Sequence, residues 1–190
     1  MVQNNINGSL NKWANIDWRE ERASVLGVLS LFINYLITYK MNTDFRVAEV
    51  ELSYKNRVPY KDRKKVLTSE DAYKLLLNNH DDNTIDYTET FKVLYLNQSS
   101  QVVGCNTLSK GGITTTCVDV RNVMQGALLT NAVAMVLGHN HPSGNTRPSR
   151  EDDRITNQIV KAGQLLNIQV IDHIIFTREQ FYSYNDEGRI

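Results

Sequence analysis

Residues 132–176 read AVAMVLGHNHPSGNTRPSREDDRITNQIVKAGQLLNIQVIDHIIF. A mostly apolar run lies at each end of this stretch, at 132–138 and at 168–176. Apolar runs of this length without regular alternation are typical of strands that are covered on both faces. Between them, a polar loop leads to Ser149, which can cap a helix that extends to about Leu166. The stretch therefore predicts a buried strand, a polar loop, a long helix and a second buried strand.

The rest of the chain from about Ala48 onward shows shorter elements of the same kinds. Alternating or β-branched runs bounded by turn residues predict strands, and Thr68 and Asp119 are good helix N-caps. The predicted strands are 48–54, 91–96, 101–108, 113–117 and 181–184, and the predicted helices are 68–79 and 120–131. The two strands 91–96 and 101–108 are close enough to form a hairpin. This order predicts an α/β sandwich with a mixed, mostly antiparallel sheet flanked by helices.

Composition narrows the possible functions. The 190 residues carry 21 basic and 21 acidic side chains, so the formal net charge is zero. Neutrality argues against a protein whose main task is to grip a phosphate backbone, although a local basic patch remains possible. Cys105 and Cys117 form no Cys-x-x-Cys pair, which argues against a cysteine-based zinc knuckle. We expect both thiols to be reduced and partly buried, as in a reducing cytoplasm.

Residues 1–45 differ from the remainder and are interpreted as an N-terminal extension of unknown role, followed by one domain at 46–190. The extension begins with an Asn-rich stretch and contains the apolar run 25–37. This run is shorter than the ~20 apolar residues that a membrane-spanning helix needs. Three interpretations stay open: a helix at the edge of the domain, which is favoured, a membrane association, or a true start at Met41.

The loop after the first buried run contains a possible metal site. His139 and His141 are two residues apart at the end of a strand, so both imidazoles can point to the same side. Asp152 lies in the first turn of the following helix, where its carboxylate can swing back toward the strand end. Two histidines and one aspartate make up the three-ligand set of a catalytic zinc site, with water in the fourth position. From spacing alone, a helix N-terminal acid and a polar loop remain an equal alternative.

The pattern His139-x-His141, seven residues, Ser149, two residues, Asp152 resembles the JAMM motif of the MPN/JAB metalloproteases. The variant HNHPSG followed by PSxxD resembles the RadC family in particular, as do the stretches FKVLYLN, SKGGIT, LGHNHPSG and LLNIQVIDHII. The similarity covers about residues 48–190. It implies a cytidine-deaminase-like JAB/MPN sandwich that binds one Zn²⁺ per chain.

The same resemblance implies two further site residues. Glu89, just before the strand at 91–96, matches the glutamate that acts as the general base. Ser149 matches the serine that helps to hold the tetrahedral intermediate, a role that competes with helix capping for the same hydroxyl. By contrast, Asp153 is expected to point to solvent. His173 is interpreted as a structural, hydrogen-bonded histidine.

We therefore expect a zinc-dependent metallopeptidase that attacks an amide or isopeptide bond of a protein or peptide substrate in a bacterial cytoplasm. The alternative is a DNA-binding protein of DNA repair or of mobile elements, in which the JAMM site is not used as a peptidase. A scaffold without activity is a third possibility, against which the complete set of expected site residues argues. Membrane attachment is not expected, and the oligomeric state is left open.

Overall fold

The computed structural model describes residues 31–35, 50–51, 53–111 and 118–190. The chain divides into two compact units, 1–50 and 51–190, and each is considered by itself. In the first unit, residues 31–35 are helical and exposed. Among the described residues, no helix is long and apolar enough to cross a membrane. The boundary at residues 45 and 46 stays a prediction.

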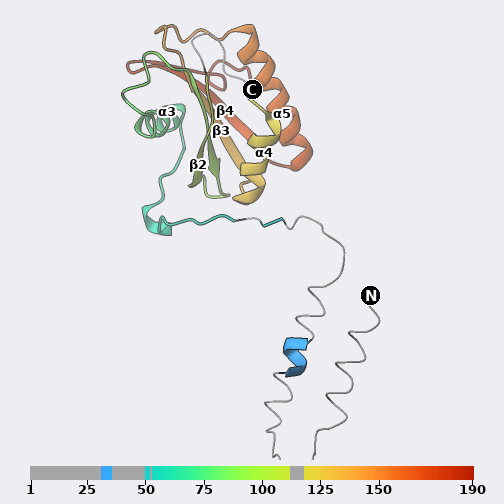
Figure 1. Cartoon of the computed structure of the whole chain (residues 1–190). Coiled ribbons are helices and arrows are strands. Elements are labelled where there is room, and N and C mark those ends of the chain that lie inside the picture. Colours follow the sequence, from blue (N-terminus) through green and yellow to red (C-terminus); the bar gives the residue numbers. More distant parts are fainter. Residues whose placement is uncertain (1–30, 36–49, 52, 112–117) are drawn as a thin grey trace, which may run out of the picture. The chain divides into compact units, whose positions relative to one another are not determined.

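The second unit is built on a five-stranded sheet with the order β2-β1-β3-β4-β5 (Figure 1). The strands are β1 (Thr90–Leu96), β2 (Val102–Lys110), β3 (Ala134–Asn140), β4 (Gln169–Phe176) and β5 (Phe181–Ser183). Only the β3–β4 pair is parallel, and the other three pairs are antiparallel. The mixed, mostly antiparallel sheet predicted from the sequence is thus confirmed.

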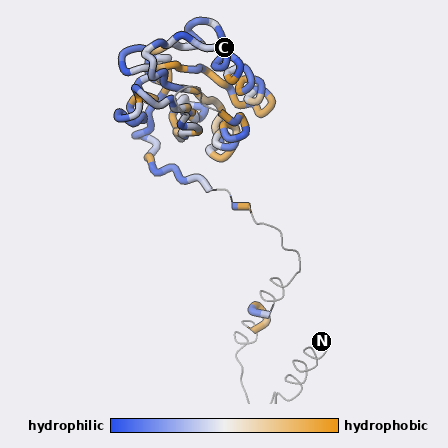
Figure 2. The backbone as a smooth tube through the Cα atoms, turned by 45° about the horizontal axis from the view of Figure 1, so that its top comes forward, coloured by the Kyte–Doolittle hydropathy of each residue, from blue (hydrophilic) through white to orange (hydrophobic). Residues whose placement is uncertain are grey.

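Helices cover both faces of this sheet, which explains the continuous apolar runs of the central strands. Helix α3 (Ser69–Asn78) packs on one face, and α4 (Val120–Leu129) and α5 (Arg150–Leu166) pack on the other (Figure 1). Because strand side chains alternate, the odd residues of β1 contact α4 and α5 while the even residues contact α3. Figure 2 shows hydrophobic and hydrophilic residues alternating along the helices of this unit.

Lys92 is one of the even-numbered residues of β1, and its surroundings explain why a charged side chain is tolerated in the core. Lys92 is buried, and its Nζ donates to the carbonyl oxygen of Asn79 and to Thr107 Oγ1, both at 2.9 Å. Asn79 is the C-cap of α3, so the ammonium group meets the negative end of that helix. Burial lowers the pKa of Lys92 below its ordinary value.

Several local predictions are confirmed and others are corrected. Thr68 and Asp119 are N-caps, but residues 50–51 and 53–54, predicted within a strand, are not in one. There the Tyr54 hydroxyl donates to the carbonyl of Val103 on β2, so a side chain makes this contact instead of a backbone ladder. The predicted strand 113–117 lies outside the described residues.

Cys105 is a free thiol and is exposed on edge strand β2, not partly buried.

Helix α5, which precedes β4, lies so close to the start of that strand that little space remains for a side chain between them. Gly163 in α5 is buried, and a Cβ atom built on it would lie 2.4 Å from the carbonyl oxygen of Ile168. That oxygen belongs to the backbone and cannot move without shifting the start of β4. The small residue is therefore required by the close approach of helix and strand.

We predict that Gly163→Ala destabilises the fold by about 1–3 kcal/mol through overpacking, although glycine-to-alanine changes in a helix ordinarily stabilise by about 1 kcal/mol. The measurement is urea unfolding, with the exposed neighbour Gln164→Ala as the control, which should change stability by less than about 0.5 kcal/mol. A more stable Gly163→Ala protein would refute the close approach.

Candidate metal centre

The end of β3 carries the two predicted histidine ligands. The strand continues through Asn140, two residues beyond the predicted limit, so His139 is in the strand and His141 follows it. His139 is almost completely buried, and its Nε2 lies 2.9 Å from Nε2 of His141. Both rings therefore present the same nitrogen to one point, as their spacing predicted.

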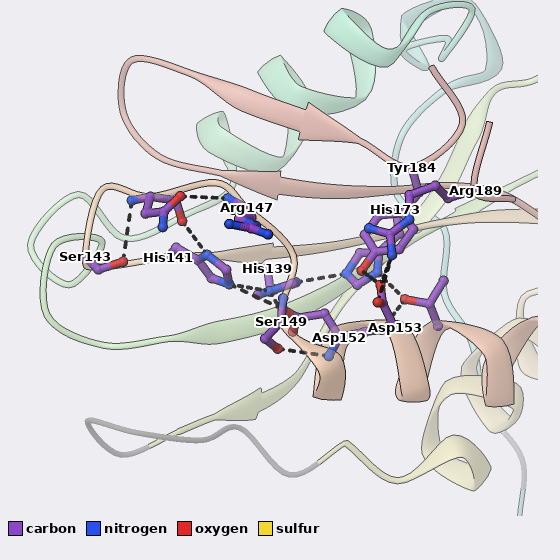
Figure 3. Close-up of polar contacts among 12 residues, drawn as sticks. His139, His141, Ser143, Arg147, Ser149, Asp152, Asp153, His173, Tyr184 and Arg189 are labelled. Carbon is purple, nitrogen blue, oxygen red and sulfur yellow. Dashed lines mark hydrogen bonds and ion pairs between the residues drawn. The ribbon is translucent and has the colours of Figure 1, made fainter. Parts of the chain in front are cut away.

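The third predicted ligand reaches this point from the first turn of α5 (Figure 3). Oδ1 of Asp152 lies 3.2 Å from Nε2 of His139, and Oδ2 lies 3.7 Å from Nε2 of His141. One ligand atom from each of the three residues can be chosen so that all lie within 4.8 Å of one another. This triangle has the donor types and the compactness of a mononuclear zinc site.

A hydrogen bond on the far side of His141 prepares it to bind a metal. Its Nδ1 lies 2.6 Å from the carbonyl oxygen of Asn145, which can only accept a hydrogen bond. In the neutral ring, Nδ1 therefore carries the proton, and Nε2 directs a lone pair toward His139 and Asp152. A cation between these nitrogens and the carboxylate would satisfy all three groups, so the residues fit a bound zinc ion.

Asp152 is ionised in this setting. Burial opposes its ionisation, but the contacts of the carboxylate with His139 and Ser149 outweigh burial and hold its pKa well below the ordinary value. The Ser149 amide donates to Oδ2 at 2.7 Å, and Ser149 Oγ accepts from the Asp152 amide at 3.1 Å. This is a reciprocal capping box. The carboxylate is thus aimed by the start of the helix.

The two functions expected of Ser149 do not exclude each other. As N-cap, its oxygen accepts a hydrogen bond through a lone pair. A hydroxyl has a second lone pair and one proton, so the O–H remains a donor beside the Asp152 carboxylate. Capping therefore fixes the position of Oγ without using its proton.

Glu89 lies just before β1, the neighbour of β3. In the antiparallel register Phe91 is paired with His139, where the β1–β3 pairing ends, so Glu89 precedes the last paired residue of β1 by two positions. Glu89 is half-buried and its carbonyl accepts from the Gly111 amide, which continues the β1–β2 pairing. No hydrogen bond or ion pair of its carboxylate occurs within the described ranges.

Asn140, between the two histidines, fixes the backbone on either side of Glu89. Its Oδ1 accepts from the Thr90 amide at 2.8 Å, and its Nδ2 donates to the carbonyl of Thr88 at 2.9 Å. Nδ2 also donates to the carbonyl of Ile85 at 2.8 Å. The side chain is fully buried on the α3 face, opposite to the histidines. Because its hydrogen bonds are satisfied, this polar residue can extend β3 beyond the apolar run.

Behind His139 lies a histidine that sequence analysis interpreted as structural. His173 Nε2 is 2.8 Å from Nδ1 of His139, and the His173 ring is completely buried. Burial keeps its pKa well below the ordinary value. The only signal in the sequence was a histidine inside an apolar strand, which does not reveal its partner on β3.

Asp153, expected to point to solvent, instead joins the C-terminal segment to α5. Its Oδ1 accepts from the Tyr184 hydroxyl at 2.9 Å and from Arg189 at 2.7 Å. Tyr184 stacks on His173 with the ring planes 16° apart, so this contact borders the metal centre. The Asp153 carboxylate thus holds Tyr184, which stacks on His173 behind the metal centre. Asp153 is not one of the three ligand residues.

Comparisons with known proteins agree with this geometry. A family model described as the RadC-like JAB domain matches residues 66–189. The chain is 47% identical over 100 residues to a UPF0758 protein of Flavobacterium johnsoniae, a stretch covering 53% of this chain and 44% of that protein. It is equally similar over 100 residues to UPF0758 protein YfjY of Escherichia coli K12, covering 53% and 62%.

A longer match extends to a UPF0758 protein of Bacillus cereus strain B4264. It is 35% identical over 134 residues, which are 70% of this chain and 58% of that protein. The matched stretches cover between 44% and 62% of these three relatives, so the chain spans about half of their length. The printed names state no activity.

We predict that the purified protein binds about one zinc per chain and that Asp152→Ala abolishes this binding, because two imidazoles alone leave the centre incomplete. Metal analysis after dialysis against a weak chelator measures it. Glu151→Ala, which removes an exposed carboxylate one residue away, should keep the full zinc content. Unchanged zinc in Asp152→Ala would show that the metal binds elsewhere.

We predict that Asn140→Leu lowers the free energy of unfolding by about 3 kcal/mol or more, since two buried carbonyls and one amide lose partners worth about 1–3 kcal/mol each. Chemical denaturation measures the change, and hydrogen exchange should show faster exchange at Thr90. A loss below about 1 kcal/mol would contradict the clamp on residues 88–90.

Proposed function

We propose, from the premise that this chain belongs to the family of RadC-like JAB domains, that it is a zinc-dependent hydrolase of amide or isopeptide bonds. The observation that carries the proposal is the convergence of His139, His141 and Asp152 on one point beside the start of β1. Its substrate would be a protein or peptide. The bacterial relatives and the low cysteine content favour a bacterial cytoplasm as its setting.

The ligand set supports hydrolysis with a single metal. His139, His141 and Asp152 would hold the zinc ion, which would supply a water whose pKa is lowered toward about 7. Glu89, two residues before the partner of His139 on β1, would accept a proton from the attacking water and deliver it to the leaving amine. The Ser149 hydroxyl would donate to the oxygen that becomes negative during attack on the carbonyl.

Two properties of the chain favour this function over DNA processing. Nucleases that cleave phosphodiesters commonly use two metals, whereas the metal-ligand cluster among the described residues contains a single carboxylate. The zero net charge also argues against a protein built to bind phosphate backbones. The proposal therefore keeps peptide substrates first and treats DNA binding as an outcome of the test.

The decisive experiment is a screen of peptide and isopeptide substrates with the zinc-loaded protein and its Glu89→Gln variant. Glu89→Gln should keep its zinc and lose about 10²- to 10⁴-fold in turnover, because only the general base is removed. The control is Glu70→Gln, which removes an exposed glutamate paired with Lys74 on α3 and should leave turnover unchanged.

Two results would contradict the proposal in part or in whole. Full activity of Glu89→Gln on a verified substrate would reject Glu89 as the general base. Absence of cleavage across the panel, combined with tight DNA binding that weakens steeply with salt, would favour the DNA-binding alternative.

A further inference from the structure

We propose that His173 is a positioning residue, which sets the tautomer and the ring orientation of His139 through a chain of hydrogen bonds that ends on the backbone of Asp152. The inference rests on the zinc centre of the proposed function but not on hydrolysis. It concerns how the centre is preorganised to bind metal. Its components come from β3, β4 and α5, so no short sequence motif contains them (Figure 3).

The direction of every hydrogen bond in the chain follows from its last acceptor. Thr156 Oγ1 lies 2.6 Å from the carbonyl oxygen of Asp152, which can only accept, so the Thr156 hydroxyl donates there. Its proton is then used, and Oγ1 must accept from His173 Nδ1, also at 2.6 Å. In a neutral His173 ring, the proton is on Nδ1 and the lone pair is on Nε2.

That lone pair determines the state of the first ligand. Nε2 of His173 accepts from Nδ1 of His139 at 2.8 Å, so the proton of a neutral His139 lies on Nδ1. The remaining lone pair is on Nε2, the atom that faces His141 and Asp152. His139 therefore reaches the metal-binding tautomer through His173, whereas His141 reaches it through the carbonyl of Asn145.

The surroundings of His173 support a neutral and immobile ring. It is completely buried, and no carboxylate is hydrogen-bonded to either ring nitrogen in the described part of the chain. Tyr184 stacks on it at a centroid distance of 4.9 Å, and Phe91 contacts it edge-on at 5.6 Å. A charged imidazolium would lose its hydration there without a compensating anion, so the neutral form is favoured.

The chain also couples two ligands that lie on different elements. Thr156 is one turn after Asp152 on α5, and its side chain bonds back to the Asp152 carbonyl. His139 on β3 is thereby connected through β4 to the helix turn that carries the third ligand. Hydrogen bonds to the outer nitrogen of a ligating histidine orient the ring, and their loss typically weakens metal binding 10- to 100-fold.

The test compares the zinc affinities of His173→Phe and His173→Gln in the full chain by competition with a chromogenic chelator. Phenylalanine keeps the ring packing but accepts no hydrogen bond, so the zinc dissociation constant should rise about 10- to 100-fold. Glutamine can accept from His139 and donate to Thr156, so its affinity should lie nearer to that of the wild type. Thermal unfolding of the metal-free proteins checks that each variant is folded.

A second variant breaks the chain one step away. Thr156→Val removes the acceptor of the His173 proton and should weaken zinc binding by a smaller factor, about threefold or more. Thr130→Val is the matched control, because the Thr130 hydroxyl makes the same kind of bond, to the Gly126 carbonyl in α4 at 2.8 Å, away from the centre. It should not change zinc affinity.

The outcomes separate the two proposals. Wild-type affinity in a folded His173→Phe or Thr156→Val protein would overturn the inference alone. Equal losses in His173→Phe and His173→Gln would overturn it too, since ring shape would then matter and not hydrogen bonding. A wild-type protein that binds no zinc would overturn the centre itself. Zinc binding without any cleavage would reject hydrolysis and leave this inference standing.

Discussion

The carboxylate of Asp152 is the group on which the arrangement of the centre depends. It accepts from the Ser149 amide in a capping box and faces Nε2 of both histidines. Helix α5 therefore begins at the place that closes the triangle, and the helix N-terminus favours the negative charge of the carboxylate. A single acidic side chain thus couples the start of a helix to the end of β3.

Strand alternation explains how β3 serves two faces of the sheet at its end. His139 and His141 project toward the face covered by α4 and α5, while Asn140 projects toward α3 and binds the backbone around Glu89. The residue between the ligands is consequently as constrained as the ligands. It fixes the strand start from which Glu89 projects, so the metal ligands and the proposed base share one short segment as their support.

The sequence predicted the features that depend on local patterns. Ser149 and Thr68 were identified as N-caps because capping depends on residues within one turn, and the buried strands because continuous apolar runs need cover on both faces. The prediction of a strand at 48–54 was wrong where the structure describes it, because alternation alone does not supply a partner strand. The roles of Glu89 and Ser149 came from family resemblance and remain predictions.

His173 shows the limit of local reasoning. Its partners are 34 and 17 residues away, and only the parallel pairing of β3 and β4 beneath α5 brings them together. Burying a histidine in an apolar strand costs desolvation free energy. In a purely structural role, a single hydrogen-bond partner of any kind could offset that cost. Here both ring nitrogens are hydrogen-bonded along one chain between two proposed zinc ligands. That arrangement uses both nitrogens in a defined direction, which is what the support of a ligating imidazole requires.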